Sequence, residues 1–439
     1  MAWEKMIAQA AIGMLAKVCI KHDHFHGLFW VSVVLAVFIG FLPGTGCTML
    51  HAAQGPTKRV VTQEEIQCAI KRATTYLARA NDQNGRFTYK VDLLPAHHRF
   101  KPQYNIIRHA GAMYALAQAW HQVPDERDNV RAALRRSARF LVAHCMAPIP
   151  GHANMLGIWS LPAITHRKGP AMVKLGGAGL GLAALISTEK IVPNTISRDD
   201  LHRIGRFLLF MQSSDGRFAT RYIPSRRGKR LRPASLYYPG EAALGLLMLY
   251  QLDHSPQWLT AAAKGLRFLI KNRDIITSDP WSLIACAKLV SLPNYPEKIL
   301  PRHEVIAYAR NVSLAILEEQ ILYGRKQQII GGFNKQGRTT PTATRVEALF
   351  AILDIIGRDD AMLRNTIQSS IRSAIKFLLD AQVTKGKYAG GIPRVTRRLP
   401  VRKKSEPRRA GEIRIDYVQH LLSALLKCAA NKESCESLH

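Results

Sequence analysis

Apolar residues recur at helical spacing along most of the chain, and the helical segments are of two kinds. One kind is amphipathic with basic residues on its polar side and covers residues 63–81, 126–146, 197–213, 256–272, 301–320 and 360–382. The other kind is apolar on nearly every side and covers residues 105–121, 171–187, 238–252, 279–292, 341–356 and 411–430. The two kinds alternate strictly along the chain. Because a helix that is apolar all round is buried, this alternation predicts outer helices packed around inner ones.

We therefore expect an all-α (α/α)6 toroid of six inner and six outer helices in residues 58–432, followed by a short tail at 433–439. An open helical solenoid would show the same alternation. Six hairpins are the number that closes a ring, and we favour the closed form. The Gly-rich stretches 176–179 and 240–245 agree with it, because small residues let inner helices approach closely around a crowded axis.

Four outer segments end in turns that combine Gly with an aromatic residue: Asn84–Phe87, Asp215–Phe218, Gly331–Phe333 and Lys385–Tyr388. A glycine in such a turn supplies the positive φ that ends a helix. The stretch Met211–Phe218 resembles the Gln-x-x-Asp-Gly-x-aromatic repeats of squalene-cyclase-type toroids. The helix plan is also similar to that of six-hairpin glycosidases and of the C-terminal domain of glucuronyl epimerases.

Three further segments, Arg108–Gly111, Lys174–Gly177 and Tyr237–Ala242, resemble a bacterial toroid family, and this resemblance points to no particular activity. These resemblances cover roughly residues 63–430 and imply a fold. They imply no reaction, because toroid families use one architecture for unrelated chemistries. The Asp-x-Asp-Asp acid motif of the cyclases is missing, and Ser197–Asp200 is better interpreted as a helix cap. An isoprenoid or terpene cyclase is therefore disfavoured.

The N-terminal residues 1–57 have the pattern of a leader. Leu28–Leu42 is apolar and uncharged, and it is shorter than the roughly 20 residues of a membrane-spanning helix. It suits a signal peptide that follows Lys17 and Lys21, with translation starting at Met1, Met6 or Met14.

Small residues precede Cys47, as in a bacterial lipobox, although Gly44 replaces the usual Leu. We therefore expect a protein of the cell envelope, exported across or anchored to the bacterial inner membrane, with Cys47 as a candidate lipidation site. The alternative is an uncleaved membrane anchor over residues 28–50.

The net charge is strongly positive: 62 Lys and Arg residues against 31 Asp and Glu residues give a formal charge of +31. Such a charge attracts polyanions, which include nucleic acids, anionic lipids and acidic polysaccharides. Export and the lack of a recognised nucleic-acid-binding module argue against a nucleic acid. We therefore expect an acidic polysaccharide or another anionic envelope polymer as the partner. Two basic runs, Arg221–Arg232 and Arg394–Arg409, suit this ligand, although such runs are often only solvated loops.

Loop lengths place the working face of the toroid. Connections from an outer to the next inner segment are mostly long, about 20 to 28 residues, whereas those from inner to outer are about 5 to 11. Long loops in a compact domain usually carry function. They all precede inner helices, so we expect a ligand-binding cup at the N-terminal ends of the inner helices, where unsatisfied N–H groups favour anions.

Polar residues of the inner segments gather at the same end. They are Arg108, His109, Lys174, Tyr237, Tyr238, Glu241, Asp279, Trp281, Arg345, Glu347, Asp416, Gln419 and His420. A charged residue in a buried helix is costly unless it is paired or used. Each residue alone has a structural alternative, an ion pair that ties neighbouring helices together. Their common position instead indicates a cup.

The candidate catalytic residues are Glu241, Asp279, Asp416 and His109. The three carboxylates suit general acid, base or nucleophile roles, and His109 or His420 suits proton abstraction next to a uronate carboxylate. The candidate binding residues fall into two groups. Tyr237, Tyr238 and Trp281, together with Trp159, would stack on sugar rings. Arg108, Lys174, Arg345, Glu347 and His420 would contact polar groups, the cations holding a uronate or phosphate.

The seven cysteines contain no CxxC motif, and neither a metal site nor a cofactor is expected. Cys145 and Cys286 stand in apolar settings and are expected to be buried. Cys428 and Cys435 could pair in an oxidising compartment.

These features favour an exported enzyme that acts on an acidic glycan by hydrolysis, elimination or epimerisation. The alternative is a protein that binds an anionic envelope polymer without catalysis. Whether the chain is an enzyme stays open from the sequence. Two carboxyl groups about 5 to 10 Å apart across an open cup would favour glycosidase chemistry. If every carboxylate instead forms an ion pair with a cationic neighbour, binding without catalysis is favoured.

Overall fold

The computed structural model describes residues 60–93, 103–272, 279–324, 327–358, 360–396 and 409–435. The expected leader, its apolar segment at 28–50 and Cys47 lie outside these residues. From Val60 onward the chain forms one compact unit. Within the described ranges, no helix has both the length and the apolar character that crossing a bilayer requires.

The predicted alternation of outer and inner helices is confirmed. The outer helices are α3 (Gln63–Ala80), α5 (Arg127–Cys145), α8 (Arg198–Phe210), α10 (Pro256–Lys271), α12 (Arg302–Glu319) and α14 (Ala361–Ala381). The inner helices are α4 (Ile106–Ala119), α7 (Leu175–Glu189), α9 (Tyr238–Asp253), α11 (Pro280–Val290), α13 (Thr339–Ile355) and α15 (Ile415–Ala430). A single-turn helix, α6 (Pro162–Thr165), lies in the connection from α5 to α7, and another, α16 (Lys432–Cys435), follows α15.

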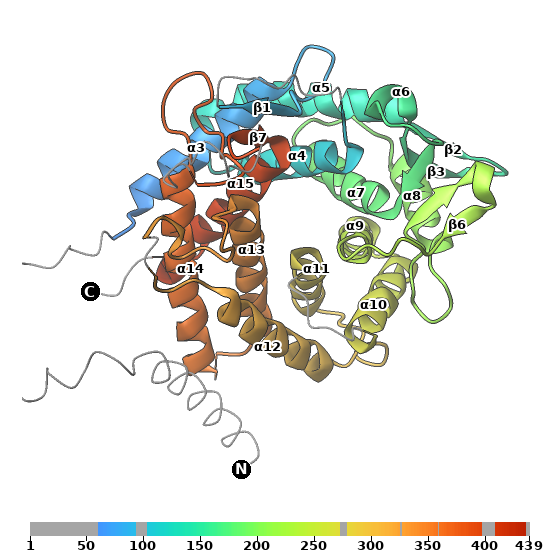
Figure 1. The fold of residues 1–439 in the computed structure, drawn as a ribbon. Helices are drawn as coiled ribbons and strands as arrows, with labels where there is room; N and C mark the ends of the chain where they lie inside the picture. The colour runs from blue at the N-terminus through green and yellow to red at the C-terminus, as the bar shows by residue number, and fades with distance from the viewer. Residues whose placement is uncertain are drawn as a thin grey trace, which may run out of the picture. The chain divides into compact units, whose positions relative to one another are not determined.

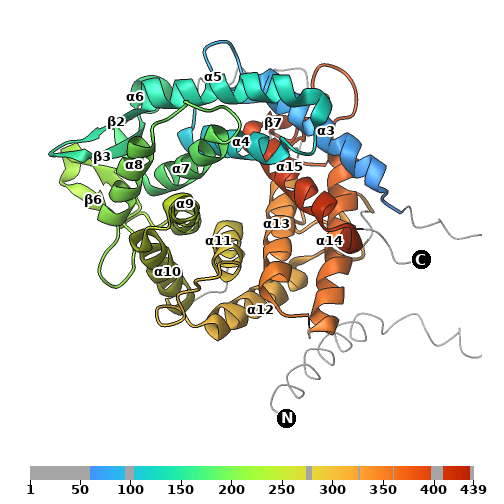
Figure 2. The same ribbon diagram turned by 180° about the vertical axis from the view of Figure 1, so that it is seen from behind.

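The ring is closed. Each inner helix packs against the next in chain order, and the last, α15, packs against the first, α4 (Figure 1). The view from behind shows the same ring, with α5, α8, α10, α12, α14 and α3 around it (Figure 2). The open solenoid is therefore excluded, and the chain is an (α/α)6 toroid.

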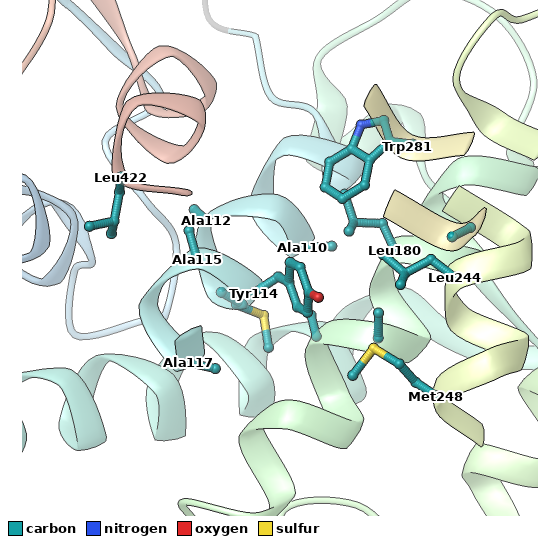
Figure 3. Close-up of a cluster of buried hydrophobic side chains, with 14 of the residues drawn as sticks. Ala110, Ala112, Tyr114, Ala115, Ala117, Leu180, Leu244, Met248, Trp281 and Leu422 are labelled. Carbon is teal, nitrogen blue, oxygen red and sulfur yellow. The ribbon is translucent and has the colours of Figure 1, made fainter. Parts of the chain in front are cut away.

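Small residues bring the inner helices into close contact. A Cβ atom on Gly179 would lie 2.5 Å from the Cα of Ala242, and one on Gly240 would lie 2.4 Å from the backbone N of Ser282. Neither position accepts a side chain without moving backbone, which agrees with the predicted crowding. Around this axis, apolar side chains from several inner helices converge into one cluster (Figure 3).

The predicted glycine turns link successive outer helices. Gly85, Gly216 and Gly331 have φ values of +80°, +94° and +86°, and a Cβ on each would strike a carbonyl oxygen of the next outer helix. In the fourth turn the equivalent residue is Gly390, which abuts the carbonyl of Arg72 in α3 and so closes the outer ring. Gly386, which the sequence suggested for this role, has positive φ but no neighbour within 4 Å.

Short strands correct the all-α expectation. β1 (Lys90–Asp92) pairs with β7 (Glu412–Arg414). A second, five-stranded antiparallel sheet orders its strands as β2 (Met146–Ile149), β3 (His152–Ser160), β4 (Met172–Lys174), β5 (Arg221–Ile223) and β6 (Gly228–Arg230). The basic run that begins at Arg221 is thus partly a hairpin.

The same strands shift the starts of two inner helices. α7 and α15 begin at Leu175 and Ile415, later than the predicted 171 and 411, because the preceding residues pair as strands β4 and β7. The partner of β7 stands far away in the sequence, whereas β4 pairs with β3, which ends at Ser160, and with β5, which begins at Arg221. Helical periodicity gives no sign of these pairings.

The predicted helix cap at Ser197 and the predictions for four of the cysteines are also confirmed. Ser197 caps α8 by accepting a hydrogen bond from the backbone N of Asp200 at 3.0 Å. Cys145 and Cys286 are buried, as expected. Cys428 and Cys435 form a disulfide that ties the end of α15 to α16.

Candidate active site

A cavity of about 540 Å³ opens at the N-terminal ends of the inner helices, where the loop lengths predicted a cup. Its lining residues come from the first two turns of the inner helices and from the connections that precede them. They are Asn105, Ile107, Arg108, Leu180, Ser235, Tyr237, Tyr238, Glu241, Pro280, Trp281, Arg338, Thr340, Pro341, Thr344, Arg345, Arg394, Arg414, Asp416, Tyr417, Gln419 and His420. The structure thus brings eight of the twelve predicted catalytic and binding residues to one cavity.

Glu241, in the first turn of α9, is an uncompensated carboxyl group at this cavity. It is 4% exposed, and its Oε2 has no hydrogen-bond partner among the described residues. The carboxyl group lies against α7, where a Cβ on Gly176 would be 1.9 Å from Oε2. Burial, and then the charge of Asp279, raises the pKa of Glu241 to about 8. Near neutral pH this side chain is therefore mostly a neutral acid.

Asp279 does not line the cavity, and the expectation that it points into the cup is wrong. It is fully buried as the N-cap of α11, where its Oδ1 accepts a hydrogen bond from the backbone N of Trp281 at 3.0 Å. A cap of this kind satisfies a helix terminus. Its influence on the cavity is electrostatic, through the raised pKa of Glu241.

Asp416, at the start of α15, is held by two arginines. Its Oδ1 lies 2.5 Å from Nε of Arg414, and its Oδ2 lies 3.1 Å from Nε of Arg108. Burial by itself would raise the pKa of Asp416, but the charges of Arg108 and Arg414 outweigh it and hold the pKa below its usual value. Asp416 is thus a fixed anion that orients both guanidinium groups.

His420 reaches the cavity and is backed by a buried carboxylate. Its Nδ1 lies 2.7 Å from Oε2 of Glu347, whose side chain is 3% exposed and does not line the cavity. Burial would lower the pKa of His420, but the charge and hydrogen bond of Glu347 prevail and raise it. Glu347 therefore favours the protonated imidazole, and it has no direct access to a ligand in this cavity.

His109 is placed away from the cup, contrary to the sequence expectation. It is fully buried, with Nδ1 2.8 Å from the hydroxyl of Tyr104 and Nε2 3.0 Å from the carbonyl of Ser137. Its ring packs among Phe87 and Phe140 at centroid distances of 5.2 and 5.3 Å. Burial lowers its pKa to about 4, so the ring is a neutral core residue. His109 follows Arg108 directly in α4, but its side chain points toward the outer helix α5.

Five arginines line the cavity: Arg108, Arg338, Arg345, Arg394 and Arg414. Arg345 pairs with Glu319 at 2.8 Å, whereas neither Arg338 nor Arg394 forms an ion pair with any carboxylate that the structure describes. Arg338 was not predicted, because the sequence placed the start of its helix at residue 341. A backbone bridge between Arg338 and Val395 places it beside Arg394, which opens the second basic run.

Of the four aromatic residues expected to stack on sugars, three line the cavity and one does not. Tyr237, Tyr238 and Trp281 line the cavity, and Tyr237 is 39% exposed. Trp159 does not line it, because this residue lies in β3 with its Nε1 donating to the carbonyl of Ala147 at 3.0 Å. Tyr417, which the sequence did not single out, lines the cavity as well. Trp281 and Tyr417 are only 5% and 4% exposed, so Tyr237 and Tyr238 offer a ligand the more accessible aromatic faces.

Lys174, the last residue of β4, lines a separate small pocket together with Arg221. Of the described residues of the two basic runs, Arg394 lines the main cavity. Residues 397–408 of the second run lie outside the described part of the chain. In the ranges that the structure describes, no group of His, Cys, Asp and Glu side chains is arranged to hold a metal ion.

No family model matches the sequence, and no curated protein matches it. Solved structures are similar along most of the chain. A cellobiose 2-epimerase from Bacillus thermoamylovorans has a TM-score of 0.59 at 11% identity, covering 84% of this chain and 99% of that one. A D-mannose isomerase has a TM-score of 0.58 at 10% identity, covering 84% and 98%.

An α-1,6-mannanase from a Salegentibacter species has a TM-score of 0.55 at 13% identity, covering 84% and 99%. Identities this low establish a shared architecture and no shared reaction. The chain therefore has the (α/α)6 toroid fold that these structures share.

Proposed function

We propose that this protein is an enzyme that acts on an acidic glycan in the cavity at the N-terminal ends of its inner helices. The observation that carries the proposal is the composition of the cavity wall, where five arginines and four aromatic residues line the cavity together with one neutral carboxyl group. Guanidinium groups bind carboxylates and phosphates, and aromatic faces suit sugar rings. The three similar structures are named for activities on sugars, which agrees with a glycan as the ligand.

The cavity favours proton transfer over hydrolysis by two carboxylates. Of the described carboxyl groups, only Glu241 and Asp416 line it, and Asp416 is occupied by two arginines. A glycosidase needs one carboxyl group as an acid and a second as a base or nucleophile. Glu241 alone is available for such a role.

The proposed step begins with a uronate carboxylate bound by Arg338 and Arg394, which acidifies the neighbouring C–H bond. The ionised form of Glu241, a minor fraction near neutral pH that grows as the pH approaches 8, removes that proton. In an elimination the electron pair forms a C=C bond, the C–O bond to the leaving sugar breaks, and His420 protonates the leaving oxygen. In an epimerisation His420 instead returns a proton to the opposite face of the same carbon.

Non-catalytic binding of an anionic polymer remains the second candidate. It is favoured by Asp416 and Glu347, because both carboxylates are committed to cationic neighbours. The same arginines and aromatic residues would then hold the polymer without proton transfer.

A panel of uronate polymers, incubated with the full-length protein in D₂O, separates these functions. Elimination gives unsaturated oligomers by mass spectrometry, epimerisation gives deuterium on the uronate carbon, and binding gives neither. We expect Glu241→Gln to abolish turnover while it retains binding, and the exposed Glu64→Gln to leave both unchanged. Neutral polymers with the same linkage control for charge. Turnover that survives Glu241→Gln, or hydrolysis without deuterium on carbon, would refute the mechanism.

We also propose that the protein is exported and held at the cell envelope through Cys47. The leader pattern supports this location, and so does the disulfide between Cys428 and Cys435, since disulfides persist in oxidising compartments. Membrane fractionation and mass spectrometry of the mature N-terminus test it. A lipid on Cys47 that is lost in Cys47→Ser is expected, whereas a soluble chain with an intact leader would contradict it.

A further inference from the structure

A second, smaller pocket of about 140 Å³ has four cationic residues among the ten that line it. They are Arg167, Lys168, Lys174 and Arg221. No acidic residue lines the pocket in the described structure, and none of the four cations forms an ion pair with a described carboxylate. Its other lining residues are Ser160, Pro162, Thr165, Gly169, Pro170 and Met172.

The sheet brings these charges together. Lys174 ends β4 and pairs in register with Arg221 at the start of β5. Residues 167 and 168 follow α6, a turn that lies beside β2 and β3 at the edge of the ring (Figure 2). Lys174 and Arg221 are half-buried, and Nε of Arg221 is a buried donor with no hydrogen-bond partner among the described residues. Solvent therefore does not fully compensate these charges.

The electrostatics of Lys174 agree with an anion-binding site. Burial first, and then the neighbouring charges of Arg167, Arg221 and Arg108, together lower its pKa to about 8. Like charges held together in a partly buried pocket destabilise one another. A bound anion would relieve that repulsion and restore the full charge of Lys174.

The pocket adjoins the main cavity. Arg108, which lines the main cavity, acts on the charge of Lys174. Two residues after Lys174, Gly176 meets both Tyr238 and Glu241, since a Cβ there would lie 2.6 Å from Cδ1 of Tyr238. The small pocket therefore stands next to the end of the cavity that holds Glu241. Its volume, about a quarter of the cavity's, suits one charged substituent, with room for a few water-sized groups.

We propose that this pocket is a second anion-binding subsite, which holds a phosphoryl, sulfate or carboxylate substituent of the glycan adjacent to the sugar in the main cavity. The inference that an anion binds there rests on the pocket alone. The inference that this anion is a substituent of the glycan rests on the proposed function. With two subsites, a chain that carries charges on successive sugars would bind better than one with a single charge.

Inorganic phosphate tests the pocket without any glycan. Titration of the full-length protein, followed by calorimetry and by the thermal unfolding midpoint, is expected to show binding and stabilisation. Lys174→Met and Arg221→Gln should each weaken it on the order of ten- to a hundred-fold, because each removes a charge-assisted hydrogen bond. Lys190→Met removes an exposed charge at the other end of α7 and is the matched control. Equal phosphate affinity in wild type, Lys174→Met and Arg221→Gln would overturn the proposal.

Glycan binding supplies the second readout. Uronate oligomers with one charged sugar and with several are compared in wild type and in Lys174→Met. We expect the preference for several charges to disappear in Lys174→Met, while affinity for the singly charged oligomer stays within about two-fold. A preference that survives the substitution would refute the adjacent subsite. Phosphate binding without any glycan binding would instead refute the proposed function and leave the anion site standing.

Discussion

The raised pKa of Glu241 has a consequence for stability that does not depend on the substrate. Replacing this carboxyl group by the neutral amide in Glu241→Gln removes its titration and keeps the shape of the side chain. Burial and Asp279 raise the pKa from its usual 4.5 to about 8, whereas the unfolded chain keeps the usual value. The difference between the two pKa values is a difference in stability between pH values.

The sign follows from which state holds the proton. Below about pH 4.5 the carboxyl group is protonated in both states, and ionisation plays no part. From there to about pH 8 the folded protein keeps a proton that the unfolded chain loses, so the free energy of unfolding falls as the pH rises. At roughly 1.4 kcal/mol per pH unit, the wild type loses up to about 5 kcal/mol over this window and no more above it.

Urea unfolding of wild type and Glu241→Gln at several pH values between 4.5 and 8.5 measures this effect. The difference between the two free energies isolates Glu241, because other titrating groups are common to both proteins. We expect Glu241→Gln to gain stability over wild type steadily as the pH rises, and the gain to level off near pH 8. Glu64→Gln controls for the loss of an exposed carboxylate. A difference that is independent of pH would refute the argument from burial.

Four further substitutions test the turns, the cavity wall and the carboxylate behind His420. Gly216→Ala forces a Cβ to 2.4 Å from a carbonyl oxygen and should cost about 3 kcal/mol in urea unfolding, whereas Gly386→Ala, with open space, should cost about 1 kcal/mol. Arg394→Gln should weaken uronate binding about ten-fold by calorimetry and flatten its salt dependence; unchanged binding would exclude that contact. Glu347→Gln should lower the pKa of His420, as measured by a proton NMR titration. In the wild type the pair stabilises the fold at low pH, and this stabilisation is lost as the pH rises through the pKa of His420. Glu347→Gln should remove it.

The periodicity of apolar residues was sufficient to predict the ring. The positions of the helices follow from local spacing, caps and glycine turns, which are all local features of the sequence. Ser197, for example, caps the start of α8, and Gly216 follows the end of this helix. The β1–β7 pair could not be predicted, because Lys90 pairs with Arg414 across most of the sequence. Three residues on each side are too few for a periodic signal.

For the cavity, too, the sequence determined one part and the tertiary structure another. The sequence alone placed a polar end at the starts of the inner helices, since the inner helices are apolar elsewhere. Only the tertiary structure decided which side chains face that end. His109 stands next to Arg108 in the same turn, yet it is fully buried among outer-helix residues while Arg108 lines the cavity. Neighbours on a helix point about 100° apart, and which direction faces the axis depends on the packing of the whole ring.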